Sequence, residues 1–387
     1  MLARARAIGR LLSAAFRRKR LSYLVWFVTA RCNARCKMCF YWRRLEEGSA
    51  SSELSIDEIR AISDTLGPLF QIVVSGGEPF LRDDLPQMAA HWHRVNRIAV
   101  LSIPTNALMP ERIVPMVDEI SARLAPVAVR INISLDGIGA LHDEIRGVPG
   151  GYEKTIKTLE GLKTLKTAHA NLAVNINSVL SSYNRDHIAD VAEHVVNELR
   201  PDLYTIGRLR GESPDPKAAD VTVEDYARAS ALLRRLEKAC HGERYFFHSF
   251  GGSVNRLMRD LVEETERRRA MIVPCPAGTK LLVIDEVGNV YPCEMLQHLM
   301  DTGQVDVLPE PGAVMGSLRE FDCDMSRLLN SERARRIAAF IKDERCWCTY
   351  ECAILAGVLL NPHCYPMLAK GILGRQSVAA DSSMPKG

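Results

Sequence analysis

The chain has 387 residues, of which 47% are hydrophobic and 25% are charged, a composition typical of a folded globular protein with room for two or three domains. Its formal net charge at pH 7 is only +3, and no stretch of Lys and Arg alternates with aromatic residues, so we expect no nucleic acid as a partner. Eleven cysteines, with no signal peptide and no apolar run of 18 residues, argue against disulfides and a membrane-spanning helix and indicate metal–thiolate chemistry in the reducing cytoplasm.

The first 20 residues predict a leading helix with one apolar and one basic face. Five apolar residues repeat at helical spacing on one face, namely Ile8, Leu11, Leu12, Ala15 and Phe16. The same stretch carries seven basic residues, namely Arg4, Arg6, Arg10, Arg17, Arg18, Lys19 and Arg20. Such a helix can lie on an anionic membrane, where each basic residue contributes about 1 kcal/mol. Packing against the following domain is the alternative, so we expect a cytoplasmic protein, with a peripheral contact to the inner face of the membrane as a further option.

Between residues 21 and 240, strand-like runs rich in branched residues alternate with helical patterns. The expected strands lie near 22–29, 71–75, 97–103, 127–135, 172–180 and 203–209. The expected helices lie near 53–66, 84–95, 110–123, 152–168, 184–199 and 222–240, with capping boxes at Ser55 and Thr222. Six strand–helix units predict an α/β fold, a partial TIM-like (βα)6 barrel whose reactive residues follow the carboxyl ends of the strands.

Three cysteines, Cys32, Cys36 and Cys39, follow the first expected strand with the spacing C-x3-C-x2-C. A closed structural zinc site takes four ligands, whereas an iron–sulfur cluster held by three thiolates leaves one iron open to a reacting molecule. Half of a zinc site completed by residues elsewhere is the alternative. The tight spacing lets three sulfurs face one cluster, so the motif predicts a metal centre with an open position.

A second motif, Ser75-Gly76-Gly77-Glu78-Pro79, follows the second expected strand. The cysteine motif after one strand and Gly-Gly-Glu-Pro after the next together resemble the radical S-adenosylmethionine (SAM) superfamily. The resemblance implies a 4Fe-4S cluster on the three cysteines, with the amine and carboxylate of SAM chelating the open iron. It also implies that Gly76, Gly77, Glu78 and Pro79 line the amino group of SAM.

The next two strands also end in polar residues. Thr105 and Asn106 follow the third strand, and Ser134 and Asp136 follow the fourth, so all four are expected as cofactor-binding residues at one mouth of the barrel. Ordinary turn chemistry is the alternative for each pair taken alone. By resemblance to family members with SPASM or twitch extensions, Arg146 is expected near the carboxylate of SAM, which a guanidinium pairs through two parallel hydrogen bonds. A surface arginine in a loop is the alternative for that residue.

Beyond a helical linker expected at 241–270, residues 271–370 form a second predicted domain, and a tail follows at 371–387. A hairpin around a glycine turn brings Cys275 and Cys293 together near the start of this domain. Two cysteines joined in this way can form half of a metal site, so the second domain is expected to hold a metal of its own.

Three further cysteines, Cys346, Cys348 and Cys352, follow with the spacing C-x-C-x3-C. With the hairpin pair they resemble the SPASM and twitch modules, which hold auxiliary 4Fe-4S clusters, although the full SPASM pattern is not matched. We therefore expect a small α+β domain with one auxiliary cluster on the hairpin pair and two of these three cysteines. A second cluster would need Cys364, the cysteine left over from these three, and Cys323 or a ligand other than cysteine. Tetrahedral zinc on the thiolates of the first cluster is a further alternative.

Together the motifs predict a radical SAM enzyme. By resemblance, one electron cleaves SAM to methionine and a 5'-deoxyadenosyl radical, which abstracts hydrogen from an unactivated carbon of the substrate. The auxiliary cluster would accept or conduct an electron, and flavodoxin or ferredoxin would be the electron donor. The substrate stays open between a peptide, a lipid-linked molecule and a small molecule, and no residue is assigned as acid, base or hydrogen donor. A non-catalytic iron–sulfur electron carrier and a zinc-stabilised scaffold are the alternatives from other classes.

Overall fold

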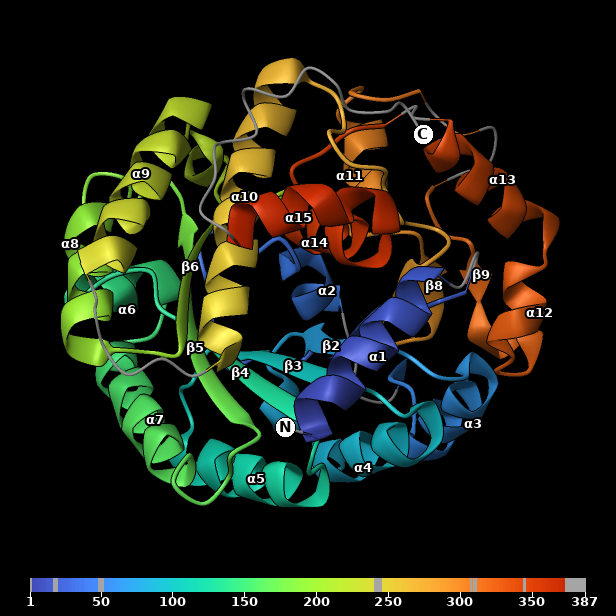
Figure 1. Ribbon diagram of the computed structural model, residues 1–387, viewed down its shortest axis with the longest axis horizontal. Helices are drawn as coiled ribbons and strands as arrows, with labels where there is room; N and C mark the ends of the chain where they lie inside the picture. Colours follow the sequence, from blue (N-terminus) through green and yellow to red (C-terminus); the bar gives the residue numbers. More distant parts are fainter. Residues whose placement is uncertain are drawn as a thin grey trace.

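The structure is a computed structural model that describes residues 2–16, 20–47, 52–239, 246–306, 308, 312–343 and 346–372. Some predictions fall outside what it describes, namely the side chains of Arg4, Arg6 and Ile8, the residues Arg17, Arg18 and Lys19, and the tail from residue 373 onward. Figure 1 shows the arrangement of the described elements, in which a curved sheet is surrounded by helices on its outer side.

Six strands form the partial barrel, and their bounds are β1 (Tyr23–Thr29), β2 (Gln71–Gly76), β3 (Val100–Thr105), β4 (Ala128–Ser134), β5 (Leu172–Leu180) and β6 (Leu203–Arg208). Each pairs in parallel with the next along the chain. On β4, Val129, Ile131 and Ile133 are fully buried toward the outer helices, so the alternate residues Arg130 and Asn132 face the inside of the barrel. The predicted α/β partial barrel is confirmed.

Helices cover the outer face of this barrel in the predicted alternation (Figure 1). Their bounds are α3 (Ile56–Leu66), α4 (Leu85–Asn96), α5 (Pro110–Arg123), α6 (Ala140–Arg146), α7 (Gly151–Leu165), α8 (Ile188–His194) and α9 (Val223–Ala239), with short helical turns at Pro79–Leu81, Val195–Leu199 and Pro216–Ala219. The short helix α2 (Trp42–Glu47) instead follows the cysteine motif and lies in the middle of the view in Figure 1. Both predicted capping boxes are present, because Ser55 exchanges hydrogen bonds with Glu58 and Thr222 does so with Asp225. The short helices α2 and α6 were not predicted, because six and seven residues are too few for a helical periodicity to stand out.

The predicted hairpin is also present, but it belongs to the barrel sheet. It consists of β7 (Leu281–Ile284) and β8 (Asn289–Tyr291), followed by β9 (Gly316–Ser317). β7 pairs in parallel with β1, and β8 and β9 continue in antiparallel order, which gives one nine-stranded sheet in the order β6-β5-β4-β3-β2-β1-β7-β8-β9. The cysteine-rich C-terminal region is therefore attached to the barrel through backbone hydrogen bonds.

The remaining helices lie in this C-terminal region, and their bounds are α10 (Phe246–Arg268), α11 (Leu296–Asp301), α12 (Met325–Leu329), α13 (Glu332–Lys342), α14 (Glu351–Leu360) and α15 (Tyr365–Ile372), with short turns at Leu318–Phe321 and Pro362–Cys364. In Figure 1, α10 runs beside β6, and α14 and α15 lie between α10 and α1. Among the described residues, no single helix has both the length and the apolar character to cross a bilayer. Only the pair Glu351–Leu360 and Pro362–Ala369 meets that test jointly, and it is bent by 91°.

The leading helix α1 (Leu2–Phe16) packs against the barrel. Arg10 Nη1 donates a hydrogen bond to the carbonyl of Ile98 (2.6 Å), and Lys280 Nζ donates to the carbonyl of Ala15 (2.7 Å). Ile98 and Lys280 precede β3 and β7, so α1 covers the amino ends of the strands, away from the cysteine motif. Leu12 and Phe16 stay exposed, with 41% and 68% of their surfaces accessible.

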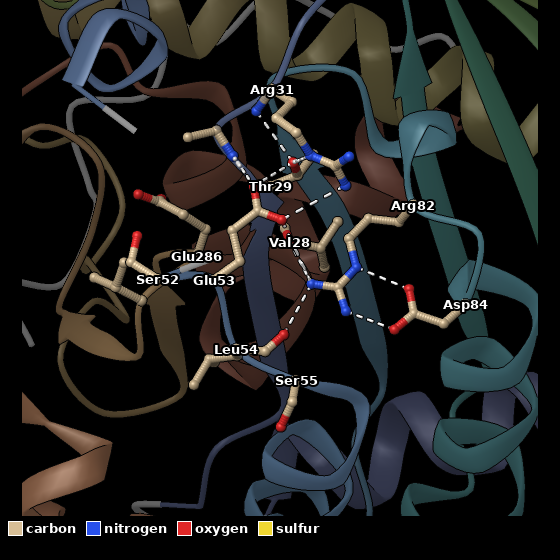
Figure 2. Close-up of polar contacts among 12 residues, drawn as sticks. Val28, Thr29, Arg31, Ser52, Glu53, Leu54, Ser55, Arg82, Asp84 and Glu286 are labelled. Atoms are coloured by element: carbon tan, nitrogen blue, oxygen red, sulfur yellow. Dashed lines mark hydrogen bonds and ion pairs between the residues drawn. The ribbon is translucent and has the colours of Figure 1, made fainter. Parts of the chain in front are cut away.

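A buried ionic network fixes the segment between β1 and the cysteines (Figure 2). Glu53 accepts hydrogen bonds from Thr29 Oγ1 (2.6 Å) and from the Ala30 backbone N–H (3.0 Å). Arg82 lies 3.9 Å from Glu53, makes two bonds to the Asp84 carboxylate (2.8 and 2.6 Å), and donates to the carbonyls of Val28 and Leu54. All three nitrogens of this guanidinium are engaged, so the network joins β1 to the chain after β2.

We expect Arg82→Met to lower the free energy of unfolding by about 3–5 kcal/mol, because it removes one of the two cations beside the buried Glu53 carboxylate, the partner of Asp84 and the donor to two carbonyls. Urea denaturation of the full chain measures this loss. Arg60→Met is the matched control, because Arg60 pairs with Asp57 (3.1 Å) on the exposed surface of α3, where ion pairs contribute little. Equal shifts of the two urea midpoints would contradict the assignment.

Candidate functional site

The cysteine motif forms a loop that rests on α6. The backbone N–H groups of Arg35 and Lys37 donate to the carbonyls of Arg146 (3.1 Å) and Ile145 (3.0 Å). Arg146 Nη1 also lies 3.6 Å from Cys36 Sγ. The loop after β1 is thus positioned by the end of the helix that follows β4.

Gly76 and Gly77 bring the end of β2 into direct contact with this loop. The N–H of Gly77 donates to the carbonyl of Thr29, and the N–H of Glu78 donates to the carbonyl of Arg31, both at 2.8 Å. A Cβ atom at Gly76 would lie 2.3 Å from the Thr29 oxygen, and one at Gly77 would lie 2.0 Å from the Arg31 oxygen. Gly76 also has a φ of 122°, which other residues rarely adopt. Neither position tolerates a side chain.

Glu78 follows the two glycines and is almost fully buried. Its Oε1 accepts hydrogen bonds from Thr105 Oγ1 (2.9 Å) and the Phe80 N–H (3.3 Å), and its Oε2 accepts one from the Asn106 N–H (2.7 Å). Burial raises the pKa of Glu78 to about 7, although these bonds act in the opposite direction. Since each carboxylate oxygen can accept two bonds, Oε2 keeps one position for an external donor such as an ammonium group.

Asn106, Asp136 and Arg146 lie around the same loop. Asn106 Nδ2 is 3.7 Å from Cys32 Sγ. Asp136 is fully buried, accepts a hydrogen bond from the Val179 N–H (2.7 Å) and pairs with Arg146. Burial acts to lower the pKa of Arg146, but Asp136 and the Cys36 thiol raise it overall, so its charge is secure. The Asp136 carboxylate is thus already engaged, whereas Nε of Arg146 is buried without a hydrogen-bond partner.

The other predicted cofactor-binding residues are Pro79, Thr105 and Ser134. Pro79 begins the short turn Pro79–Leu81, and Thr105 orients Glu78 through its hydroxyl group. Ser134 ends β4 in register with Asn177 of β5, on the inner face of the barrel. The predicted residues of β2, β3 and β4 are therefore all at the carboxyl ends of the strands, as expected.

The three thiols of the loop fit an iron–sulfur cluster. Burial, with a smaller contribution from the Cys36 thiol, raises the pKa of Cys32 to about 11 and that of Cys39 to about 12. Buried thiols ionise only if a cation compensates the charge, and the N–H groups of Asn106 and Arg146 near the sulfurs favour the thiolates. Among the described residues, no three His, Cys, Asp or Glu side chains converge as a single metal ion requires. A cubane cluster takes one thiolate per iron and does not need such convergence.

A second set of thiols lies in the C-terminal region. Burial raises the pKa of Cys275 and Cys346 to about 12 and that of Cys293 to about 11, and it also raises the pKa of Cys348. Neighbouring thiols of the same set add to the shift of Cys275, Cys346 and Cys348, so the four thiols lie close together.

Cys352 has different surroundings from the other cysteines of its motif. Besides burial, which raises its pKa, the groups that act most on its thiol are Arg210, Glu294, Tyr350 and Tyr23. The thiol of Cys352 thus lies beside charged and phenolic groups.

Cys364 and Cys323 stand apart from both sets. Burial raises the pKa of Cys364 to about 11, and no other cysteine contributes to that shift. Burial and Glu58 raise the pKa of Cys323, whose charged neighbours also include Arg319. Neither thiol therefore lies with a group that could complete the second cluster considered from the sequence.

Several buried charged residues of the site were not predicted. The Glu286 carboxylate, at the turn between β7 and β8, accepts hydrogen bonds from Tyr41 and Arg44, which follow the cysteine loop. Arg210 pairs with Glu294 at 3.4 Å and connects the end of β6 to the C-terminal region. For Glu286, the sequence indicated only an acidic residue in an expected turn. That signal could not identify Arg44, 242 residues away, as its partner.

Comparison with known proteins agrees with this site. Residues 26–195 match the model of the radical SAM superfamily. An AdoMet-dependent heme synthase from Methanosarcina barkeri is 26% identical over 353 residues, which cover 84% of this chain and 96% of the relative. The mycofactocin maturase MftC from Mycobacterium ulcerans is 30% identical over 291 residues, covering 71% of this chain and 69% of the relative.

Solved structures share the fold. The structure of native anSMEcpe with bound AdoMet aligns with a TM-score of 0.55 at 18% identity and covers 92% of this chain and 96% of that one. SuiB from Streptococcus suis bound to S-adenosylmethionine aligns with a TM-score of 0.52 at 15% identity, over 85% and 69%. The predicted fold, SAM and iron–sulfur cofactors and enzymatic nature are thereby confirmed. The chain belongs to the radical SAM superfamily.

Proposed function

We propose that the chain uses a cluster on Cys32, Cys36 and Cys39 to cleave SAM reductively and to abstract hydrogen from an unactivated carbon of its substrate. The cluster and SAM supply the radical chemistry when bound, and the protein supplies orientation and a water-poor environment. The contact that supports this proposal most directly is the pair of 2.8 Å hydrogen bonds between the Gly-Gly-Glu turn and the cysteine loop. It brings the Glu78 carboxylate to the side of the loop.

Within this proposal, each polar residue around the loop has a distinct task. Glu78 accepts the amino group of SAM on the free position of Oε2. Arg146 reaches the SAM carboxylate through its unpartnered Nε, while Asp136 holds the guanidinium in place. Asn106 and Arg146 place N–H groups near two of the sulfurs and stabilise them as thiolates.

The auxiliary cluster belongs, in this proposal, to Cys275, Cys293, Cys346 and Cys348. Cys293 raises the pKa of Cys275, Cys346 and Cys348, which supports these four thiols as one set. Such a cluster would accept an electron from the substrate or conduct one, with flavodoxin or ferredoxin as the external donor.

The names of the relatives suggest two substrate classes. The heme synthase of Methanosarcina barkeri is matched over 96% of its length, so a small molecule of the heme-precursor type is the first candidate. The mycofactocin maturase has the higher identity but is matched over 69% of its length, and it makes a peptide the second candidate. Incubation of the reconstituted enzyme with each class, followed by product analysis, separates the two.

We expect the anaerobically reconstituted wild type to form 5'-deoxyadenosine from SAM and dithionite, and the Cys32, Cys36, Cys39→Ala triple variant to form none. Iron counted in the triple variant should fall by about four atoms per chain and not to zero, because the auxiliary cluster stays. Liquid chromatography of the nucleoside and iron analysis measure the two quantities on one sample. A fully iron-loaded wild type that forms no product would favour an electron carrier.

Two single variants sharpen this test. Cys348→Ala should reduce the iron content, whereas Cys352→Ala should leave it at the wild-type level, since Cys293 and Cys275 act on the pKa of Cys348 while tyrosines and charged residues act most on that of Cys352. Cys323→Ala, far from both sets, is the control for the effect of losing any thiol. Loss of iron in the Cys352 variant alone would overturn the assigned ligands.

SAM binding should weaken as the pH falls through the pKa of Glu78. With that pKa raised to about 7, the carboxyl group is protonated below pH 7 and no longer accepts the SAM ammonium, so affinity should fall by up to about tenfold per pH unit. Glu78→Gln should bind at least about tenfold more weakly at pH 8 and lose this dependence. Equilibrium dialysis of labelled SAM between pH 6 and 8 measures both, with Glu111→Gln on exposed α5 as the control.

A peripheral membrane contact of α1 would use its exposed Leu12 and Phe16 side chains. The double variant Leu12→Ser, Phe16→Ser should lose at least half of the binding of the wild type to vesicles that contain phosphatidylserine. Co-sedimentation measures it, and Ile138→Ser, which removes another exposed apolar side chain, is the control. Equal sedimentation of all three proteins would dismiss the contact and with it the support for a lipid-linked substrate.

A further inference from the structure

Polar side chains form a continuous stripe across the inner face of the barrel. Asn132 Nδ2 donates to Ser102 Oγ (2.8 Å), and Asn175 Nδ2 donates to Asn132 Oδ1 (3.0 Å), which joins β3, β4 and β5 through side chains. Thr205 Oγ1 donates to Asn177 Oδ1 (2.8 Å) and extends the stripe to β6. The opposite face of these strands supplies the apolar core, so the stripe is not needed for packing and suits a polar ligand.

Arg130 lies at the deep end of this stripe. It is two residues before Asn132 on β4, in register with Ser102 of β3 and Ala173 of β5. Four positions separate it from Ser134 at the carboxyl end of the strand, which corresponds to about 13 Å along the strand. A group bound by Arg130 would therefore lie well below the mouth that carries the cysteine loop.

This guanidinium has no partner within the described chain, where no hydrogen bond or ion pair involves it. Two arginines nearer the cysteine loop are different, since Arg146 pairs with Asp136 and Arg82 pairs with Asp84 (2.6 Å). None of the nitrogens of Arg130 is fully covered, so all three stay accessible to water. Arg130 is therefore a cation for which the described residues supply no anionic partner.

The groups that act on the charge of Arg130 include no anion either. Burial lowers the pKa of Arg130, and the one group acting against this is Tyr23, a phenol whose own pKa burial raises. Tyr23 OH accepts a hydrogen bond from Gln71 Nε2 (3.2 Å) and is not an anion at neutral pH. Because Arg130 is only half-buried, its guanidinium stays charged, and no group of the described chain competes with an anion that enters the barrel.

We infer that Arg130 binds a carboxylate of the substrate inside the barrel, with the amide and hydroxyl groups of the polar stripe beside it. The inference rests on the proposed function, because it requires the substrate to enter the barrel. It adds the substrate class, a molecule that carries a carboxylate at the end remote from the carbon that reacts. A guanidinium matches a carboxylate through two parallel hydrogen bonds, which orients the molecule as well as holding it.

The test measures binding of 4-fluorobenzoate to the reconstituted full-length protein by the line width of its fluorine NMR signal. The neutral isostere 4-fluorobenzamide is the ligand control. We expect the wild type to bind the carboxylate and not the amide, and Arg130→Met to weaken carboxylate binding at least about tenfold. Arg130→Lys, which keeps the charge but loses the fork, should fall between the two.

Arg123→Met is the matched protein control. Arg123 is on the outside of α5 and lines a groove of about 420 Å³ with Arg60 and Arg94, where a benzoate could bind through surface charge alone. Loss of binding in this variant, unchanged binding in Arg130→Met, or no binding of the carboxylate by the wild type would each overturn the inference. Displacement of the probe by inorganic phosphate at lower concentration than by acetate would overturn the choice of a carboxylate.

The fluorobenzoate binding test does not depend on SAM cleavage. Thermal melting and SAM binding of Arg130→Met should equal those of the wild type, because Arg130 contacts neither the cysteine loop nor Glu78. If 5'-deoxyadenosine is not formed but the fluorobenzoate binds through Arg130, the proposed function fails and the anion site stands. If 5'-deoxyadenosine is formed but Arg130→Met binds 4-fluorobenzoate as well as the wild type does, only the inference about Arg130 fails.

Discussion

Two backbone carbonyls, those of Thr29 and Arg31, hold the Gly-Gly-Glu turn against the cysteine loop, and the site depends on this contact. The approach is so close that a Cβ atom at Gly76 or Gly77 would overlap the carbonyl oxygens. The same short segment is fixed on its other side by Glu53, through its bonds to the hydroxyl of Thr29 and the N–H of Ala30 (Figure 2). A thiolate-bearing loop and a carboxylate from different strands thus act as one rigid unit.

Much of the barrel could be predicted, because its signals are local. The alternation of buried residues on β4, the caps at Ser55 and Thr222, and the spacing of the cysteines are all visible within about ten residues of the chain. Gly76 and Gly77 were identified for the same reason. Six parallel units then placed the motifs at one end of the strands, since every crossover returns to the same side of the sheet.

Long-range partners could not be predicted from such signals. Glu286 contacts Arg44 across 242 residues, and nothing in the spacing of either residue marks the pair. Arg130 is an ordinary alternating residue of a strand until its neighbours are known, and its lack of a partner in the described chain is a property of the fold. For Cys352 the spacing predicts a ligand, and only the fold shows that its thiol, at the start of α14, lies beside tyrosines and charged groups.

The pairing of β7 with β1 has a consequence for how the two regions depend on each other. In a chain cut before β7, β1 would become an edge strand of seven buried, largely apolar residues with one row of backbone groups unpaired. Such an edge invites association with other chains, so the barrel and the cysteine-rich region are best regarded as one cooperative folding unit instead of a catalytic module with a removable accessory.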